Sequence, residues 1–415
     1  MRRGNPLKEC FFNPVEYVDG HLKFDQFDVV KLTKKLKTPF YLYSENAFVY
    51  NYDLYRLAAQ AFHLNDPLIC YALKANPNLH LLKSIAKKGA GADIVSQGEL
   101  AYALRAGIRP DKIIFSGVGK TGQEIFEALN CSPEGIYSFN VESEDELFLI
   151  DKIASSMHKV ARVAFRFNPN IIAKTHRNIQ TGGKYHKFGI LEDDICRLDQ
   201  KMSLCRNLKL VGLSIHIGSQ LTEFSALKQS IKKLVKLKNT INREIEFIDF
   251  GGGLGIDYQG KNKRPHPRDY LKEVLGSLDE KSKELRLVFE PGRSISATSG
   301  VLVTKVIRNK QSADFNFTVV DAGLNDFIRP GLYHSYHQIL PCKLTKGIKK
   351  IRTNVVGPVC ETTDQFAANL LIQTPSKEDV LIIKDTGAYG QIMSSNYNLR
   401  LKPCEYVISK GKILA

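Results

Sequence analysis

The amino-acid sequence predicts an α/β fold, a TIM-type (β/α)8 barrel, followed by a second, C-terminal all-β domain. The first observation is that strand-like apolar runs alternate with helical patterns between residues 69 and 292. Such alternation is typical of a parallel sheet, and eight strands of this kind can close into a barrel. The second observation is a change near residue 300, after which short β-rich runs are separated by turns. A chain of 415 residues is long enough for two domains.

Each predicted barrel strand is a short run of apolar and β-forming residues. In chain order the eight runs are ICYALK (69–74), GADIV (91–95), KIIFSG (112–117), IYSFNV (136–141), ARVAFRF (161–167), LVGLSIHIG (210–218), FIDFGGG (247–253) and LRLVFEPG (285–292). Helical patterns lie between them, and several end at glycine, which favours a helix C-terminus. The clearest are LHLLKSIAKKG (79–89), GELAYALRAG (98–107), GQEIFEALN (122–130) and DELFLIDKIAS (145–155).

The second domain is expected over residues 301–415, and the barrel over 38–300. Residues 1–37 are expected to join the second domain. They end in a short amphipathic helical pattern, QFDVVKLTKKLK, which is followed by a strand pattern, PFYLY (39–43). The β-rich runs of the second domain are VLVTKVIRNK (301–310), FNFTVVDAG (315–323), IRTNVVGPVC (351–360), DVLIIKD (379–385) and PCEYVISKGKIL (403–414).

The net charge of +16 does not indicate a nucleic-acid-binding protein, because the basic residues are spread along the chain. The densest cluster, KQSIKKLVKLK (228–238), has helical spacing and reads as a solvated helix face. A second effect of the charge would be mild attraction of an anionic substrate. We therefore expect neither nucleic acid nor membrane among the partners.

The eight cysteines form no CxxC pair, and several lie inside apolar runs, as Cys70 does. They are expected to be reduced thiols of a cytoplasmic protein. The basic N-terminus lacks the apolar core of a signal peptide, and no apolar run approaches the length of a membrane span.

Residues at the C-terminal ends of barrel strands form the active site in this fold. The residues expected there are Lys74, Asp93, Gly117, Asn140, Arg166, His216, the triplet 251–253, Glu290, Gly292 and Arg293. Each alone has an ordinary structural explanation. Lys74 could be a lysine whose head reaches water, and His216 a satisfied core histidine.

Two nucleotide-binding patterns are excluded by their spacing. A phosphate-binding P-loop ending at Gly119 and Lys120 would need glycine at position 114, where the chain has Ile114. The run GGGLGIDYQG does not fit GxGxxG, because the third glycine would fall on Ile256 or Tyr258. The glycines can still let backbone N–H groups approach a phosphate closely.

A strand-end lysine, glycine-rich phosphate sites and an acid after the eighth strand together describe a pyridoxal phosphate site. The lysine amine binds the cofactor aldehyde covalently, and the partner of the pyridine nitrogen tunes the ring. A carboxylate such as Glu290 keeps that nitrogen protonated, so the ring accepts electrons strongly. This favours carbanion chemistry such as decarboxylation.

Eleven segments, in order from about residue 38 to the C-terminus, resemble the signatures of the diaminopimelate decarboxylase family. They are YALKAN, GADIVSQGEL, AKTH, TGGKYHKFG, HIGSQ, GGGLG, EPGR, DAGLNDFIRPGLY, GPVCETTD, DTGAYG and SSNYNLRLKP. The family shares its barrel-plus-β architecture and its pyridoxal phosphate with ornithine decarboxylase and alanine racemase.

The resemblance implies a role for each matching residue. Lys74 would anchor the cofactor, His216 would stack on its ring, and Glu290 would meet the pyridine nitrogen. Asp93 would orient the lysine. The cofactor phosphate would be held by Ser219, Gly253, Gly292 and Tyr389, with Arg293 also near the cofactor.

The resemblance also implies how substrate is held. The distal carboxylate would be bound by Arg293, Arg329 and Tyr333, with Tyr389 nearby, and the distal ammonium by Glu361. Cys360 would protonate the carbanion. An arginine fork suits a carboxylate and a glutamate suits an ammonium, so the set recognises a second amino-acid end. Because Cys360 and Glu361 would serve the neighbouring subunit, a homodimer is implied.

The implied reaction is decarboxylation of meso-diaminopimelate to L-lysine and carbon dioxide, the last step of lysine biosynthesis. The alternative is a sister decarboxylase acting on ornithine, arginine or a carboxylated polyamine. Ornithine-type enzymes carry aspartate where this chain has Glu361, although CETTD departs from the commoner C-E-S-G-D. Alanine racemase is disfavoured by Glu290. A non-catalytic relative could lack Lys74 and Cys360, and both are present.

Overall fold

The computed structural model of the chain describes residues 12–172, 181–183, 185–241, 243–260 and 265–415. The motif AKTH (173–176) lies outside the described residues. The chain forms two compact units. Of the described residues, the first holds those between 52 and 256 and between 265 and 293, and the second holds 12–51, 257–260 and 294–415. The limits of 38–300 and 301–415 for separate domains stay a prediction.

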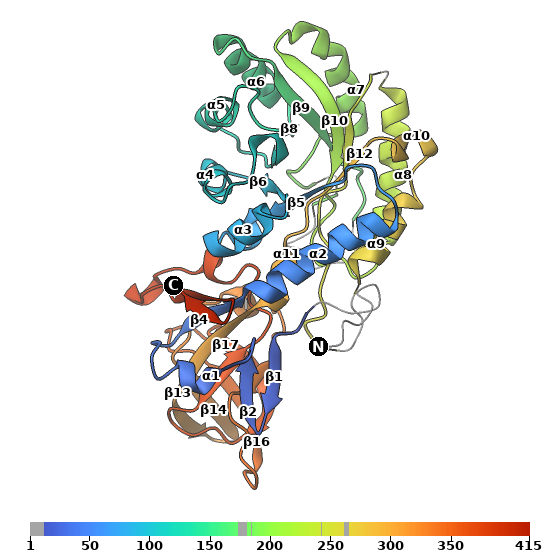
Figure 1. Ribbon diagram of the computed structural model, residues 1–415. Helices are drawn as coiled ribbons and strands as arrows, with labels where there is room; N and C mark the ends of the chain where they lie inside the picture. Colours follow the sequence, from blue (N-terminus) through green and yellow to red (C-terminus); the bar gives the residue numbers. More distant parts are fainter. Residues whose placement is uncertain (1–11, 173–180, 184, 242, 261–264) are drawn as a thin grey trace. The chain divides into compact units, whose positions relative to one another are not determined.

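The first unit contains the barrel that the sequence predicts (Figure 1). Eight parallel strands close in the order β10-β11-β12-β5-β6-β7-β8-β9. All eight predicted strands are confirmed, with bounds β5 (Leu68–Ala72), β6 (Gly91–Ile94), β7 (Ile113–Phe115), β8 (Ser138–Val141), β9 (Ala161–Phe167), β10 (Leu208–Ile215), β11 (Phe247–Asp249) and β12 (Arg286–Phe289).

The strands are nearly continuous apolar runs because helices cover the outside of the barrel. The interior is filled as well. A buried cluster inside the unit includes Cys70, Ile114, Val211, Phe247 and Val288. A Cβ at Gly212 would lie 2.6 Å from the Phe247 ring, so this position has no room for a side chain.

Helices follow the strands where the periodicity predicts them. Thr121 caps α5 in a capping box, and Asn78, Ser96 and Ser143 cap α3, α4 and α6. On α8 the lysines of 228–238 face solvent, apart from half-buried Lys238, while its leucines are buried. The longer helices are α2 (Glu45–Ala61), α3 (Leu79–Ala86), α4 (Gln97–Arg105), α5 (Gly122–Asn130), α6 (Glu144–Ser156), α7 (Glu192–Lys201), α8 (Ser225–Thr240) and α9 (Pro267–Leu275).

The second unit is built on a nine-stranded mixed sheet. Strand β4, the predicted PFYLY run, pairs antiparallel with β13 and parallel with β19. The five predicted β-rich runs are confirmed, while β15 and β17 were not predicted. The strands are β4 (Phe40–Ser44), β13 (Gly300–Ser312), β14 (Phe315–Val320), β15 (Ile339–Pro341), β16 (Lys350–Val356), β17 (Gln365–Gln373), β18 (Val380–Ile383), β19 (Cys404–Ser409) and β20 (Lys412–Leu414).

A small antiparallel sheet precedes the nine-stranded one and was not predicted. It consists of β1 (Val15–Val18), β2 (His21–Phe24) and β3 (Phe27–Asp28). The predicted helix at 26–37 is confirmed only in its centre, as α1 (Val29–Leu32), which Asp28 caps. Within the described part of the chain, no helix has both the length and the apolar composition needed to cross a membrane.

Candidate functional site

A cavity of about 360 Å³ lies at the C-terminal ends of the barrel strands. Its volume is in the range of sites for small molecules and cofactors. Each of the eight strands places a residue in its wall, either from the strand itself or from the one or two positions that follow it. In strand order from β5 to β12 these include Lys74, Val95, Ser116, Asn140, Arg166, His216, Asp249 and Glu290.

Lys74 lies on a 3-10 turn, Leu73–Ala75, directly after β5, and forms an ion pair with Asp93. The register of β5 and β6 pairs Ala72 with Asp93, which brings the carboxylate next to the amine. The Asp93 side chain is fully buried, and its Oδ1 has no hydrogen-bond partner among the described residues. The buried carboxylate therefore fixes the position of the Lys74 amine at the cavity wall.

Glu290 follows β12 and hydrogen-bonds the carboxyl of Asp249, the last residue of β11. Burial raises the pKa of Glu290 well above its usual range, and the charges of Asp249 and Asp93 raise it further. Burial also raises the pKa of Asp249, to about 6. Two carboxylates cannot hydrogen-bond without a proton between them, so this pair holds one.

His216 follows β10 and presents a neutral ring to the cavity. Burial lowers its pKa well below the usual range, and the charges of Arg166 and Lys74 lower it further. The ring Nδ1 accepts a hydrogen bond of 3.2 Å from the Gly252 N–H, which leaves the proton of the neutral ring on Nε2. A neutral, flat ring at a cavity wall can stack on an aromatic ligand.

The candidate phosphate residues of the barrel unit lie around Arg293. Its Nη2 donates to the Ser219 hydroxyl at 3.0 Å, and its Nε lies 3.3 Å from the same oxygen. Gly253 has φ +99°, and a Cβ there would lie 2.3 Å from the Gly218 carbonyl oxygen. At Gly292 a Cβ would touch Ala75 and Ala72 at about 3 Å. Both positions are packed too closely for a side chain, and Gly292 is buried.

In the second unit, two predicted site residues lie around the guanidinium of a third. Arg329 begins α12 (Arg329–Tyr333) and is 5% exposed. Its Cζ lies 5.4 Å from the ring centre of Tyr333, 5.9 Å from Tyr389 and 5.8 Å from Tyr258. Rings at these distances stabilise the cation and restrict its orientation. Tyr258 was not predicted for this role.

Cys360 and Glu361 lie together on an exposed turn of the second unit. Glu361 accepts hydrogen bonds from the hydroxyls of Tyr397, at 2.8 Å, and Thr363, at 3.0 Å. The Cys360 N–H lies 3.3 Å from Asn398 Oδ1. Seven cysteines are described, and all seven are free thiols.

The residues of the barrel cavity fit pyridoxal phosphate. The Lys74 amine can meet the cofactor aldehyde, and Glu290 Oε1 is buried without a hydrogen-bond partner among the described residues. An acceptor of this kind suits a protonated pyridine nitrogen. His216 supplies a flat neutral face. Arg293 and Ser219, which are not among the residues that line this cavity, supply donors for a phosphate.

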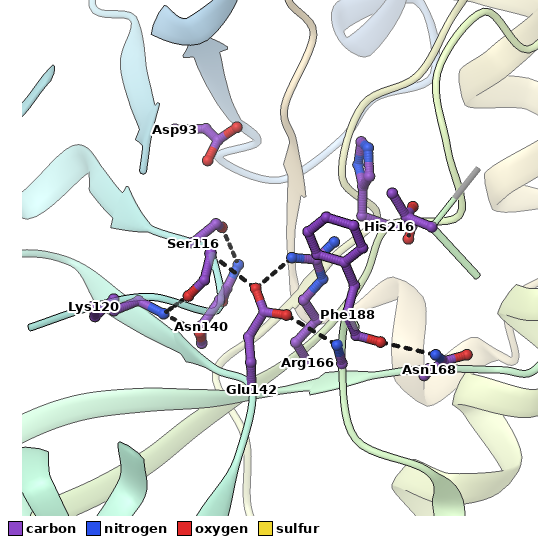
Figure 2. Close-up of polar contacts among 12 residues, drawn as sticks. Asp93, Ser116, Lys120, Asn140, Glu142, Arg166, Asn168, Phe188 and His216 are labelled. Atoms are coloured by element: carbon purple, nitrogen blue, oxygen red, sulfur yellow. Dashed lines mark hydrogen bonds and ion pairs between the residues drawn. The ribbon is translucent and has the colours of Figure 1, made fainter. Parts of the chain in front are cut away.

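Two acids of the site were not predicted from the sequence. Asp249 satisfies the strand-end rule as Glu290 does, but within FIDFGGG the same rule also selects the glycines 251–253 that follow it. Glu142, one residue beyond β8, contacts Arg166 (Figure 2). Arg166 and Asn140 had no predicted role, and the structure places both in the cavity wall. Asn140 Nδ2 donates to Asp249 Oδ2 and to the Ser116 hydroxyl, both at 3.0 Å.

Comparison with known proteins gives the same architecture and chemistry. A family model described as "Pyridoxal-dependent decarboxylase, pyridoxal binding domain" matches residues 53–297. Diaminopimelate decarboxylase of Aquifex aeolicus is 41% identical over 411 residues, which cover 98% of this chain and 95% of the relative. The Helicobacter pylori enzyme, whose crystal structure contains L-lysine, has a TM-score of 0.87 and 39% identity over 92% of this chain and 94% of that one.

A third match is the diaminopimelate decarboxylase of M. jannaschii in complex with L-lysine. It has a TM-score of 0.91 and 35% identity, and the match covers 98% of this chain and 95% of that one. Fold, cavity and family model define the class as the barrel-type pyridoxal-dependent decarboxylases. Within that class, the chain belongs to the diaminopimelate decarboxylase family.

Proposed function

We propose that the protein uses pyridoxal phosphate to decarboxylate meso-diaminopimelate to L-lysine and carbon dioxide, the last step of lysine biosynthesis. The observation that carries the chemistry is that Lys74 and the buried carboxyl of Glu290 line one cavity. The identity of about 41% to a diaminopimelate decarboxylase along nearly the whole chain supports the substrate.

In the barrel, Lys74 is proposed as the covalent anchor, and Asp93 holds its amine in place through the ion pair. Glu290 would accept a hydrogen bond from the N–H of the protonated pyridine nitrogen, with Asp249 behind it. When bound, the cofactor delocalises the electron pair left at the α-carbon after carbon dioxide departs. His216 would cover one face of the ring and exclude water from it.

Phosphate binding is assigned to Ser219, Gly253, Gly292 and Tyr389, and Arg293 is assigned to the same cofactor. The contact between Arg293 and Ser219 supports this assignment, because the guanidinium Nη2 lies 3.0 Å from the Ser219 hydroxyl. Charge-assisted hydrogen bonds from arginine are strong and directional, which suits an anion.

Substrate recognition is assigned mainly to the second unit. Arg329, fixed by tyrosine rings, would bind the distal carboxylate with Tyr333, Arg293 and Tyr389. Glu361 would bind the distal ammonium. An acid and a forked cation together select a substrate that carries an amino-acid group at each end.

Cys360 is proposed to deliver a proton to the α-carbon after decarboxylation. We also propose a homodimer in which Cys360 and Glu361 act in the neighbouring subunit's site. The exposure of both residues in the single chain supports this assignment. The free cysteines of the described residues support a cytoplasmic location.

A substrate panel tests the proposal. The purified protein with pyridoxal phosphate is offered meso-diaminopimelate, ornithine, arginine and a carboxylated polyamine in parallel, and the amine products are separated and measured. Lysine formed from diaminopimelate, without the other amines, is the expected result. Product from ornithine or arginine alone would refute the roles given to Arg329, Tyr333 and Glu361. Absence of any product would favour a non-catalytic relative.

A further inference from the structure

Glu142 is a buried acid with no role in the proposed reaction. It lies one residue beyond β8, and its side chain is 1% exposed. Its carboxylate accepts three hydrogen bonds. Oε1 accepts from the Gly117 N–H at 2.9 Å and from Arg166 Nη1, and Oε2 accepts from the Gly189 N–H at 2.9 Å. Both oxygens are therefore engaged by groups that lie far apart in the sequence.

The three donors come from different parts of the cavity wall. Gly117 follows β7 and lines the cavity, and Arg166 lies in β9 and lines it as well. Gly189 directly follows Lys187 and Phe188, which line the cavity from the segment after β9. One carboxylate thus connects a loop, a strand and the end of a segment that together enclose the cavity.

The segment that ends at Gly189 is joined to the barrel beside the same residues. Asn168 Nδ2 donates to the Phe188 carbonyl at 2.8 Å, and the Ile190 N–H donates to the Arg166 carbonyl at 2.8 Å. Gly189 has φ +71°, and a Cβ there would lie 3.0 Å from the Arg166 carbonyl oxygen. The close approach of the two backbones requires glycine at this position.

At its other described end, the segment is joined beside His216. The Thr181 hydroxyl donates to the His216 carbonyl at 2.7 Å. Lys187 and Phe188 are therefore held between one contact beside His216 and one contact at Glu142. Loss of the second contact would free the end of the segment that bears the two cavity-lining side chains.

Glu142 also compensates the positive charge of Arg166. Arg166 is 7% exposed, and its Cζ lies 5.1 Å from the centre of the Phe188 ring. Figure 2 shows Arg166 beside both Glu142 and Phe188. A buried guanidinium that loses its carboxylate is left as an uncompensated charge, which is costly. Glu142 therefore determines where this cation lies in the cavity wall.

We propose that Glu142 is a positioning residue that fixes the Arg166 guanidinium and the backbone at Gly117 and Gly189. Through these contacts it holds Lys187 and Phe188 against the cavity that is proposed to bind the cofactor. The proposal rests on the proposed function only for the activity measurement, because the contacts themselves exist in the cofactor-free protein.

The matched test uses Glu142→Gln, which keeps the shape of the side chain. One oxygen becomes an amide NH2, which cannot accept from an N–H donor, so the three contacts cannot all persist. Hydrogen exchange is measured on the cofactor-free protein for peptides that contain Gly117 and Gly189. We expect exchange about tenfold faster in both or in the Gly189 peptide alone, without change in peptides from β13.

The control is Glu246→Gln. Glu246 pairs with Arg162, which lies in β9 as Arg166 does, and the atoms Oε2 and Nη2 are 2.6 Å apart. Neither Glu246 nor Arg162 lines the cavity. This variant should leave exchange at Gly117 and Gly189 unchanged. If Glu142→Gln does not fold, Glu142→Asp keeps the charge with a side chain one methylene shorter, and the same change is expected at Gly189.

The second measurement is cofactor affinity by titration of the cofactor-free protein, followed by steady-state kinetics. Glu142→Gln should bind pyridoxal phosphate about tenfold more weakly and show a raised KM, while Glu246→Gln matches the wild type. Unchanged exchange at Gly117 and Gly189 would overturn the proposal. So would equal acceleration in every peptide, which indicates general destabilisation. A protein that passes the exchange test but does not act on diaminopimelate would refute the proposed function and leave this inference standing.

Discussion

The carboxyl groups of Asp249 and Glu290 hydrogen-bond each other at the ends of the neighbouring strands β11 and β12. Asp249 is held from both sides, since its Oδ1 accepts from the Gly251 N–H at 2.8 Å and its Oδ2 from Asn140 at 3.0 Å. Glu290 Oε1 is left for another donor at the cavity wall. The pair thus presents one fixed acceptor to a ligand and holds a proton behind it.

This pair predicts a pH dependence of stability in the cofactor-free protein. Burial raises the Asp249 pKa from 3.8 to about 6, so the folded chain retains a proton that the unfolded chain releases earlier. The contribution of Asp249 to the free energy of unfolding is therefore fully present below about pH 4 and is lost as the pH rises to about 6 and above. Denaturant unfolding at several pH values measures this change in the free energy of unfolding.

Asp249→Asn is the variant for this measurement, because asparagine does not titrate. The free energy of unfolding should then change less between pH 4 and 6 than it does in the wild type. The variant also loses one of the two accepting oxygens, so its stability at low pH should be lower. An identical pH dependence in both proteins would contradict the assigned pKa.

Glu290 should control the reaction rather than the binding of the cofactor. In Glu290→Gln the pyridine nitrogen loses its carboxylate, so kcat should fall by about 100-fold or more. Lys74 and the phosphate residues are unaltered, so the protein should still bind pyridoxal phosphate, as its visible absorption will show. A variant with bound cofactor and unchanged kcat would contradict the role of Glu290.

The barrel could be predicted because its strands are buried on both faces. Runs such as 68–72 are apolar and buried throughout, and the helices between the strands have caps that local sequence encodes. Strand β17 was not predicted, because it is only partly buried and its pattern is irregular. Asn369 has φ +50°, the register with β16 shifts beside it, and Leu371 is 54% exposed, so the alternation of a half-buried strand is broken.

The site could be predicted only as far as the strand-end rule reaches. That rule, with the family resemblance, led to Lys74, His216 and Glu290, and the structure brings all three to one cavity. It could not reveal which acids pair with which partners. Asn140 and Asp249 are 109 residues apart in the chain, and no local pattern records such a contact.

Arg329 should determine affinity for a substrate with a distal carboxylate. Lysine at this position keeps a charge but loses the planar fork, so Arg329→Lys should raise the KM for meso-diaminopimelate by about 10- to 100-fold. Arg352→Lys is the matched control, because Arg352 is exposed on β16 and its Nη1 donates to the Asn369 carbonyl, at 3.3 Å. Equal KM values in the two variants would argue against the assignment.

Hybrid dimers test whether sites are shared between subunits. Lys74→Ala and Cys360→Ala should each be inactive, but a hybrid of the two contains one site with both defects and one with neither. Mixing equal amounts after dissociation and reassociation should restore about a quarter of wild-type activity, since half of the dimers are hybrids. If mixing restores nothing although hybrids form, Cys360 and Lys74 act within one subunit.

The most direct measurement of the central claim follows carbon dioxide and lysine together. Purified protein with pyridoxal phosphate is given meso-diaminopimelate, and both products are quantified for the wild type, for Lys74→Ala and for Lys112→Ala, a lysine that lies away from the catalytic cavity. We expect one carbon dioxide for each lysine in the wild type and in Lys112→Ala, and neither product in Lys74→Ala. Lysine release that persists without Lys74, or no release by the wild type, would contradict the account.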